Sequence, residues 1–230
     1  MKPARNLAVI LPLRGIMARK LSICPLARTV IAALAFCCAP LFAAPSLQDV
    51  AELLSRNKVT RGNFVLERTA ANGKSLKSSG EFVIASDYGI IWKTIKPIKS
   101  AQVVAREWTL TESASGKRVR VDSSKNPVYM QMALLTSALW NGDLAAVQGA
   151  ADLQFWSDDR SWRIEMFPKD AAVQMALEKI VVEGTCSGQK AAATKMLMLL
   201  KGGNSAAYQM TDHTYSAALD DAERGYFSAK

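Results

Sequence analysis

The sequence predicts a mainly β protein with helices, an α+β fold built on an antiparallel sheet. Short alternating segments follow one another at hairpin spacing, separated by turn residues such as Asn72-Gly73 and Ser115-Gly116, as in antiparallel sheets. Helical segments lie before and between these strands. Of the 4 cysteines only Cys186 follows residue 43, so no internal disulfide or structural zinc site is expected in that part. We therefore expect stability to come from an ordinary packed core.

The first 43 residues have the order of an export signal. Basic residues up to Arg28 precede an uncharged apolar run over 29–42, and the small residues Ala43 and Ala44 follow. Such a run is shorter than the roughly 20 residues of a membrane-spanning helix. We predict a signal peptide over 1–43, cleaved near Ala43, with Met17 as an alternative start and an uncleaved anchor as the alternative outcome. Residues 44–230 are predicted to form a single domain.

Removing this segment changes the charge of the protein. The full chain has 29 basic and 20 acidic residues and a net charge of +9. Six basic and no acidic residues precede Ala43, so the remainder carries 23 minus 20, or +3. A basic chain is typical of nucleic-acid binding, but most of this charge lies in the predicted signal. We expect no nucleic-acid partner.

Alternation of apolar and polar residues predicts the strands. The clearest example is Trp162 to Met166, where one face is expected to be buried and the other wet. Ala193 to Lys201 contains Met and Leu residues that favour a helix, but flanking turns at Gly184 and at Gly202-Gly203 favour a strand. The predicted strands cover residues 63–68, 80–86, 90–94, 101–105, 107–112, 117–121, 152–157, 162–166, 177–183, 193–201 and 206–211.

Capping residues predict the helices. Ser46 is a good N-cap, with Asp49 three positions on as in a capping box. A second helix is expected after Asn126 as cap and Pro127 as first residue. It would end at Asn141-Gly142, since glycine suits the left-handed residue after a helix.

One face of the predicted sheet is rich in large apolar side chains. These residues would fill an ordinary core or line a cavity for an apolar ligand, because closed barrels are filled by side chains and wider or open ones hold ligands. Composition does not separate the two. The candidates for a lipid-binding cavity are Phe64, Leu66, Phe82, Ile84, Trp92, Trp108, Leu110, Trp162, Ile164 and Met166.

The second helix is a candidate lid. Its apolar residues recur at helical spacing, and a lid must bury this stripe when empty and release it when a ligand arrives. The alternative is ordinary structural packing. The candidate lid residues are Val128, Met132, Leu135 and Leu139.

Catalytic signatures are weak. His213 is the single histidine, and no glycine-framed nucleophilic serine accompanies it. Cys186 is expected to be an incidental thiol. No metal-ligand cluster or phosphate-binding glycine loop is present in the sequence. We predict no enzyme, no cofactor and no metal. The basic residues Lys117, Arg118 and Arg120 would form a docking surface for an acidic partner or, alternatively, a solvated strand face.

Several of these segments resemble the LolA-like outer-membrane lipoprotein carrier proteins, as a divergent member. The resemblance covers nearly all of the chain after residue 43 and consists of apolar and turn residues in order. It is carried by Phe64 to Arg68, Ser79 to Phe82, Gly89 to Thr94, Pro97, Trp162 to Pro168, Ile180 to Gly184 and the late methionine-rich strand.

The resemblance implies an incomplete antiparallel β-barrel covered by a helical lid. It also implies a periplasmic carrier that holds the acyl chains of lipoproteins, or of related acylated lipids, in an apolar cavity. The carrier would receive its cargo from an inner-membrane transporter and deliver it to an outer-membrane acceptor. It is expected to be a monomer. The sequence departs from the family pattern at two places. One is Glu67-Arg68, where family members usually have a glutamine. The other is Ala85-Ser86-Asp87, which lacks the second-strand arginine that helps hold the lid shut in the family.

Two other functions remain open from the sequence. One is a regulatory module of similar fold that senses lipid or protein in the periplasm and signals to a stable partner. The other, less favoured, is a periplasmic hydrolase that would have to use His213.

Overall fold

The computed structural model describes residues 44–122, 125 and 127–228, apart from the side chains of residues 127–130 and 132. All of them belong to one compact unit, Phe42–Lys230. The predicted signal peptide over 1–43 and the predicted cap Asn126 lie outside the described residues.

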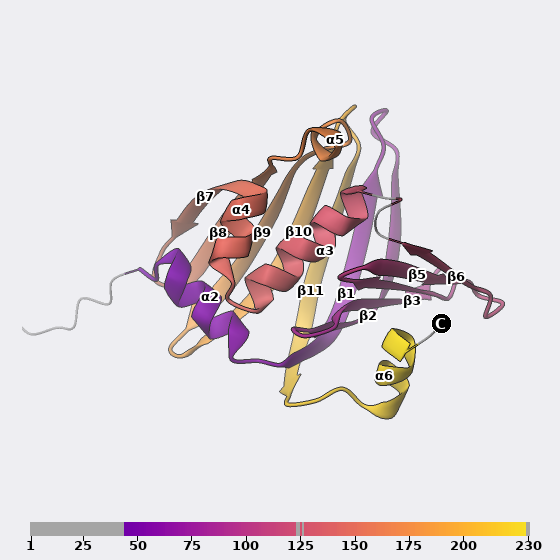
Figure 1. The fold of residues 1–230 in the computed structure, drawn as a ribbon, viewed down its shortest axis with the longest axis horizontal. Coiled ribbons are helices and arrows are strands. Elements are labelled where there is room, and N and C mark those ends of the chain that lie inside the picture. Colours follow the sequence, from indigo (N-terminus) through magenta and orange to yellow (C-terminus); the bar gives the residue numbers. More distant parts are fainter. Residues whose placement is uncertain (1–43, 123–124, 126, 229–230) are drawn as a thin grey trace, which may run out of the picture. The chain divides into compact units, whose positions relative to one another are not determined.

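The described chain forms one antiparallel sheet of 11 strands (Figure 1). Its order is β6-β5-β4-β3-β2-β1-β11-β10-β9-β8-β7, so β6 and β7 are its two edges and the sheet does not close. The prediction of an incomplete antiparallel barrel with helices is confirmed. Two meanders, β1 to β6 and β7 to β11, join where β1 pairs with β11.

The first meander holds the N-terminal strands, each paired with its neighbour in sequence. The strands are β1 (Val59–Thr69), β2 (Ser75–Ala85), β3 (Gly89–Lys96), β4 (Ser100–Ala105), β5 (Trp108–Glu112) and β6 (Arg118–Asp122).

The second meander holds the C-terminal strands. The ambiguous segment 193–201 is a strand, as predicted, because β9 and β11 supply hydrogen-bonding partners on both sides of it. The strands are β7 (Ala151–Ser157), β8 (Ser161–Pro168), β9 (Leu177–Ser187), β10 (Lys190–Leu200) and β11 (Ser205–Ser216).

The turn predicted at Gly184 is wrong. Gly184 lies within β9, opposite Trp162 of β8, and the chain turns instead at Gly188, whose φ is +60°. A Cβ at residue 184 would stand 2.2 Å from Cζ2 of Trp162. Glycine is required there to admit the indole ring, not to reverse the chain.

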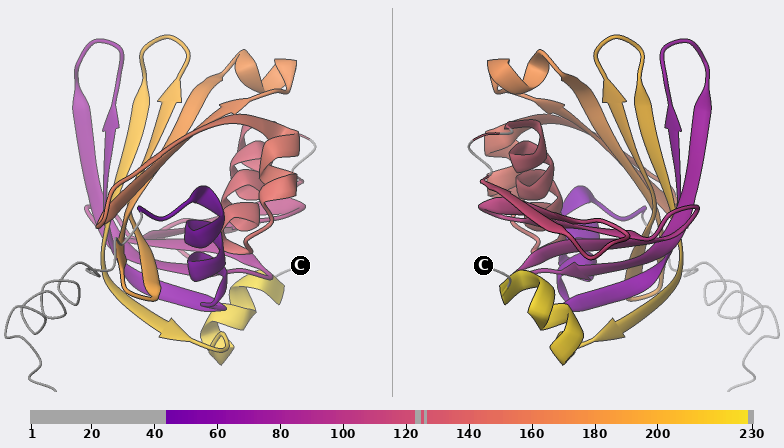
Figure 2. Two further views of the ribbon diagram at one scale, coloured as in Figure 1. Left: turned by 90° about the vertical axis from the view of Figure 1, so that its left-hand side faces the viewer. Right: turned by 90° about the vertical axis from the view of Figure 1, so that its right-hand side faces the viewer.

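Helices cover the concave side of the sheet (Figure 2). The predicted capping box is present: the Ser46 hydroxyl accepts from the backbone N–H of Asp49 at 3.2 Å, and the backbone N–H of Ser46 donates to the Asp49 carboxylate at 2.8 Å. Gly142 follows the second helix with a φ of +71°, as predicted. The helices are α2 (Leu47–Ser55), α3 (Pro127–Trp140), α4 (Leu144–Ala150) and the short α5 (Ala171–Gln174).

A further helix, α6 (Asp221–Ser228), which the sequence patterns did not predict, packs on the opposite face of the first meander (Figures 1 and 2). Glu223 is buried and receives two hydrogen bonds from the Arg61 guanidinium, each of 2.6 Å. Leu219, just before the helix, packs in a small cluster with Ile91 and Val103. The first meander is therefore covered on both faces.

None of the described helices has the length and apolar character to span a membrane.

Candidate functional site

The concave face carries the main hydrophobic cluster. Eight of the ten predicted cavity residues belong to it, all buried, beneath or beside α2, α3 and α4. The structure therefore brings most of the predicted set together on one face. The eight residues are Phe64, Leu66, Phe82, Ile84, Trp92, Trp162, Ile164 and Met166.

Trp108 and Leu110 do not join this face, which corrects the sequence-based assignment. Leu110 is directly opposite Val103 of β4, and both belong to the second cluster, beneath α6. Trp108 packs against the same cluster. Alternation along a strand shows which residues share a face, but not which face is concave. Here α6 also covers the outer face, so both faces carry apolar residues.

Aromatic side chains form a floor across the concave face. The rings of Phe64 and Trp92 meet edge to face at 5.1 Å between centroids, and Trp92 and Tyr208 lie 4.3 Å apart. Phe82 extends this cluster, with its ring 5.8 Å from that of Trp92. Such contacts are typical of tightly packed aromatic clusters, and Tyr208 of this floor also borders open space.

A large cavity lies on the other side of this floor, between the ends of the two long hairpins. Its volume is about 730 Å³, within the range of small-molecule sites. Its apolar lining comes from β2, β10 and β11 and includes Leu76, Met198, Leu200 and Tyr208. The interior of the sheet is therefore packed in one part and hollow in another.

A second cavity of about 390 Å³ continues the first toward β3 and β4. Both are lined by Arg68, Leu76, Gln102 and Tyr208, so they meet at these four residues. Of the predicted residues, Phe64, Leu66 and Trp92 line this second cavity. The two cavities form one trough beside the aromatic floor, mainly apolar in the larger cavity and mixed polar and apolar in the smaller one.

Large apolar side chains are exposed around this trough. Leu76, which lines both cavities, is 63% exposed, and Ile98, which lines the second, is 69% exposed. Met175, directly before the lining residue Ala176, is 83% exposed. Contiguous exposed apolar surface is typical of binding sites.

Several lining residues were not among the predicted set. Leu76 stands between the turn predicted up to Ser75 and the strand predicted from Gly80, and the structure shows it near the start of β2. Met198 and Leu200 lie in the segment with ambiguous propensity. Because β2 begins earlier than predicted, Leu76 extends beyond the core. The polar residues that follow Leu76 gave no local signal of a strand there.

The candidate lid helix α3 is packed into the core. Leu135 and Leu139 are fully buried there, whereas the side chains of Val128 and Met132 lie outside what the structure describes. The Asn141 amide donates to the backbone carbonyl of Ser86 at 2.8 Å. This hydrogen bond fixes the C-terminal end of α3 at the position where the family resemblance leads one to expect an arginine latch.

Ser86 itself is unusual. Its hydroxyl is buried and has no hydrogen-bond partner within the described part of the chain, although its carbonyl also accepts from the Ser137 hydroxyl at 3.3 Å. The α3 attachment therefore uses the backbone carbonyl of Ser86, in the turn after β2, instead of a charged side chain.

The contacts of His213 are structural. Its Nε2 lies 2.8 Å from the carbonyl oxygen of Ala193, and its ring packs edge to face on Phe82 at 5.6 Å. Burial lowers the pKa of His213 below its usual value. The neighbouring Asp212 carboxylate accepts from the Asn63 amide at 2.8 Å.

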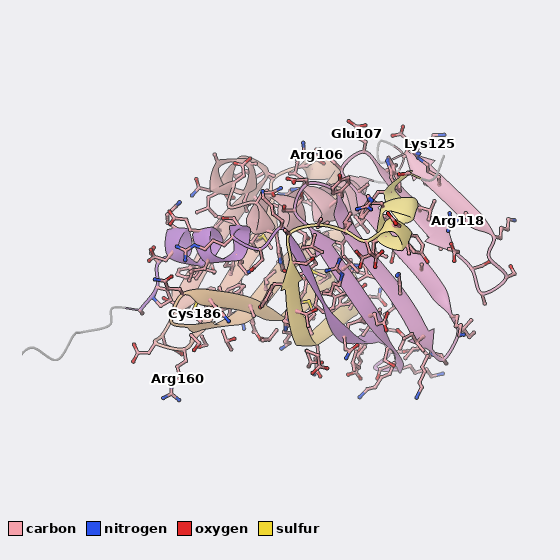
Figure 3. The ribbon with its side chains drawn as sticks, turned by 90° about the horizontal axis from the view of Figure 1, so that it is seen from below. Arg106, Glu107, Arg118, Lys125, Arg160 and Cys186 are labelled. Atoms are coloured by element: carbon pink, nitrogen blue, oxygen red, sulfur yellow. The ribbon has the colours of Figure 1, made fainter. Side chains whose placement is uncertain are left out.

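Cys186 is half-buried at the end of the sheet away from Arg118 (Figure 3). Burial raises the pKa of its thiol above the usual value, which lowers the thiolate fraction and with it the reactivity. Groups of three or more potential metal ligands do not occur in the described residues.

The basic residues of β6 have partners nearby. Arg118 pairs with Glu112 at 2.6 Å, and the Arg120 guanidinium lies 4.4 Å from the centre of the Trp108 ring. Lys117 is exposed in the preceding turn. The strand-face interpretation accounts for these contacts.

Searches with known proteins gave matches among solved structures. No family model and no curated protein sequence matches the chain. A LolA superfamily protein from Nitrosomonas europaea aligns over 77% of this chain and 94% of its own, with 14% identity and a TM-score of 0.44. A DUF1329 family protein from Desulfovibrio piger aligns over 80% and 95%, with 12% identity and a TM-score of 0.46.

The MucA/MucB complex from Pseudomonas aeruginosa also matches, over 76% of this chain and 58% of that chain, with 19% identity and a TM-score of 0.42. At these identities the likeness concerns the fold alone. The similarity to LolA-like proteins expected from the sequence is thus also found among solved structures.

Proposed function

We propose that this protein binds the acyl chains of lipoproteins, or of related acylated lipids, in the trough on its concave face and carries them across the periplasm. The observation that carries the proposal is the cavity of about 730 Å³ at the open end of the sheet, lined by Leu76, Met198 and Leu200. The exposure of Leu76 also supports the proposal. Its side chain is 63% exposed, and exposed apolar surface is typical of sites that bind apolar ligands.

Moving an acyl chain from water into an apolar cavity is favourable in free energy. Each methylene removed from water contributes roughly 0.8 kcal/mol, so even part of a long chain supplies a large binding energy. The aromatic floor of Phe64, Trp92 and Tyr208 gives the chain a preformed apolar surface, and the flexible Met198 adapts to chains of different shape.

Export, a cavity lid and membrane partners complete the proposal. Export rests on the signal-like pattern of residues 1–43. Movement of α3, whose buried face carries Leu135 and Leu139, away from the main cluster would extend the trough over the core. A donor at the inner membrane and an acceptor at the outer membrane follow from the family resemblance.

A binding assay tests the proposal at an exposed position. In Leu76→Asp, the affinity for a fluorescent fatty acid should fall by at least about tenfold, because the contact of one leucine with the chain is lost and a charge faces it. The matched control is Val119→Asp on β6, where a 50% exposed side chain lies outside both cavities. Equal loss in both variants, or none in either, would refute the site.

A transfer assay separates a carrier from the alternatives. Donor vesicles with a labelled lipoprotein and unlabelled acceptor vesicles are mixed with the protein, and transfer should rise with protein concentration and fall in Leu76→Asp. A stable complex with a partner and no transfer would favour the sensing module. Recovery of cleaved cargo would instead favour a hydrolase.

A further inference from the structure

Three cationic side chains surround the larger cavity. Arg68 comes from β1, Lys74 from the turn before β2, and Lys201 from the turn after β10. The lining contains no aspartate or glutamate. The chain therefore places three positive charges around an otherwise apolar hollow.

Arg68 stands at the junction of the trough. It pairs across the sheet with Leu76 of β2 and Ala206 of β11, and both of these residues line the larger cavity. Arg68 also lines the smaller cavity, where it is the single charged residue of the lining. Directly opposite residues of paired strands share a face, so the guanidinium belongs to the concave face with the apolar lining.

The three cations have no ion-pair partner among the described residues. The nearest comparison is Lys77, one residue after Leu76, which pairs with Glu67 at 3.6 Å. That pair lies on the other face of the same hairpin, because Glu67 and Lys77 alternate with Arg68 and Leu76. Charge is therefore balanced on the outer face of the hairpin and unbalanced on the cavity face.

The ends of the two hairpins are fixed to each other. The side-chain oxygen of Asn204 accepts from the backbone N–H of Ala71 at 3.2 Å, which joins the β1–β2 turn to the β10–β11 turn. The backbone N–H of Lys201 donates to the carbonyl of Ala176 at 2.9 Å. The turns that carry Lys74 and Lys201 are thus held at the rim before any ligand arrives, which reduces the ordering cost of binding.

From these observations we infer that the trough selects an anionic amphiphile. The acyl chain lies along Leu76, Met198 and Leu200, and a carboxylate or phosphate group is held by Arg68, with Lys74 and Lys201 beside it. The inference rests on the proposed acyl-chain function and adds the charge of the head group to it. An arginine suits this position because its planar guanidinium binds carboxylate and phosphate through two parallel hydrogen bonds.

The test compares ligands with the same tail and different heads. One pair is a tail-labelled fluorescent phosphatidylglycerol and the matching phosphatidylcholine. The other pair is a tail-labelled fatty acid and its methyl ester, at mildly alkaline pH and low salt. The anionic member of at least one pair should bind about tenfold more tightly than its partner, because hydrogen bonds between ionised groups are about twice as strong as neutral ones. A preference only between the two phospholipids identifies a phosphate as the head group. A preference only between the fatty acid and its ester identifies a free carboxylate.

Substitutions test which residues cause the preference for anionic ligands. Arg68→Gln should reduce the preference for the anionic ligand by about fivefold, and the triple variant with Lys74→Gln and Lys201→Gln should abolish it, because the anionic ligands lose more affinity than the neutral ones. Lys77→Gln and Lys190→Gln each remove one positive charge elsewhere and should leave the preference intact. Higher salt should weaken the anionic ligands more than the neutral ones.

The outcomes separate the two claims. If neutral and anionic ligands bind equally well and Arg68→Gln changes nothing, the head-group inference is overturned and the acyl-chain function stands. If none of the four ligands binds, the acyl-chain function itself fails. Equal loss of preference in Lys190→Gln and Arg68→Gln would show a general charge effect and overturn the assignment to the rim.

Discussion

Gly184 shows how one residue positions the concave face. It lies opposite Trp162 in the β8–β9 ladder, and a side chain at residue 184 would stand 2.2 Å from Trp162 and 2.3 Å from the backbone oxygen of Ala192. The sequence alone suggested a turn because glycine is common in turns. Its true role follows from a contact with a residue 22 positions earlier, which no local pattern displays.

The first prediction concerns this glycine. Gly184→Ala should lower the free energy of unfolding by about 2–3 kcal/mol, because the indole or the backbone must move. Urea unfolding followed by fluorescence measures this. Gly149→Ala is the control: it lies in α4 with open space around it, and it should raise stability by up to about 1 kcal/mol. An unchanged midpoint in Gly184→Ala would contradict the packing described.

The second prediction concerns the buried Glu223. Hydrogen bonds from Arg61 hold the pKa of this carboxyl below its usual range. A lowered pKa in the folded state stabilises the protein above the unfolded Glu pKa of about 4.3, and this contribution is lost as pH falls through the lower folded value. Glu223→Gln should therefore cost about 3 kcal/mol near neutral pH and progressively less in acid.

Unfolding midpoints of wild type and Glu223→Gln across the acidic range provide the measurement. The two curves should approach each other below the unfolded Glu pKa and converge only below the lower pKa of the folded state. Glu178→Gln, at an exposed position on β9, should track the wild type throughout. A pH-independent difference between wild type and Glu223→Gln would show that the ion pair does not hold α6 in place.

At the scale of elements, strand alternation predicted the sheet well. Trp162, Ile164 and Met166 are buried on one face as expected, and the capping residues of α2 and the glycine after α3 have their predicted geometry. The other face was expected to be wet, and there the prediction is wrong for Glu165, which is buried because its carboxylate pairs with Arg163 and Lys179. These features depend on residues within a few positions of one another, which is why the sequence alone reveals them.

The assignment of faces and the second core could not be predicted in this way. Trp108 and Leu110 alternate as clearly as the concave-face residues, yet they face α6. That helix is fixed by a contact between Arg61 and Glu223, which are 162 positions apart. Leu76 and Arg68 become cavity residues only through the pairing of β1 with both β2 and β11. Such long-range pairing leaves no local pattern.

The third prediction tests α3 as a lid. Asn141→Ala removes the hydrogen bond to the Ser86 carbonyl and should lower stability by about 1–2 kcal/mol. If α3 moves to extend the trough, the same change raises the open population, and the affinity for a long-chain fatty acid should rise by about three- to tenfold while that for a short chain stays constant. Calorimetric titration with both chains checks this.

The control for this variant is Asn57→Ala, in the turn after α2, which leaves the α3 attachment intact. Loss of stability in Asn141→Ala with no change in long-chain affinity would show that α3 stays packed during binding. The lid would then have to be assigned to another element.

For the molecule as a whole, the interior of the open sheet has a packed part and a hollow part. The part covered by α2, α3 and α4 is filled by the main cluster and stabilises the fold. The hairpins β1–β2 and β10–β11 extend beyond the helices (Figure 2) and enclose the trough. The first meander has a second core under α6 on its outer face, so it is packed on both faces, while the trough stays open.

Photo-crosslinking tests this division most directly. A long-chain fatty acid with a diazirine in the middle of its chain is bound, irradiated and mapped by peptide mass spectrometry. Labels should fall on the peptides that contain Leu76 and Met198, and excess unlabelled fatty acid should suppress them. Labels confined to the outer face around Tyr226, or labels that unlabelled fatty acid does not compete away, would contradict an acyl-chain site in the trough.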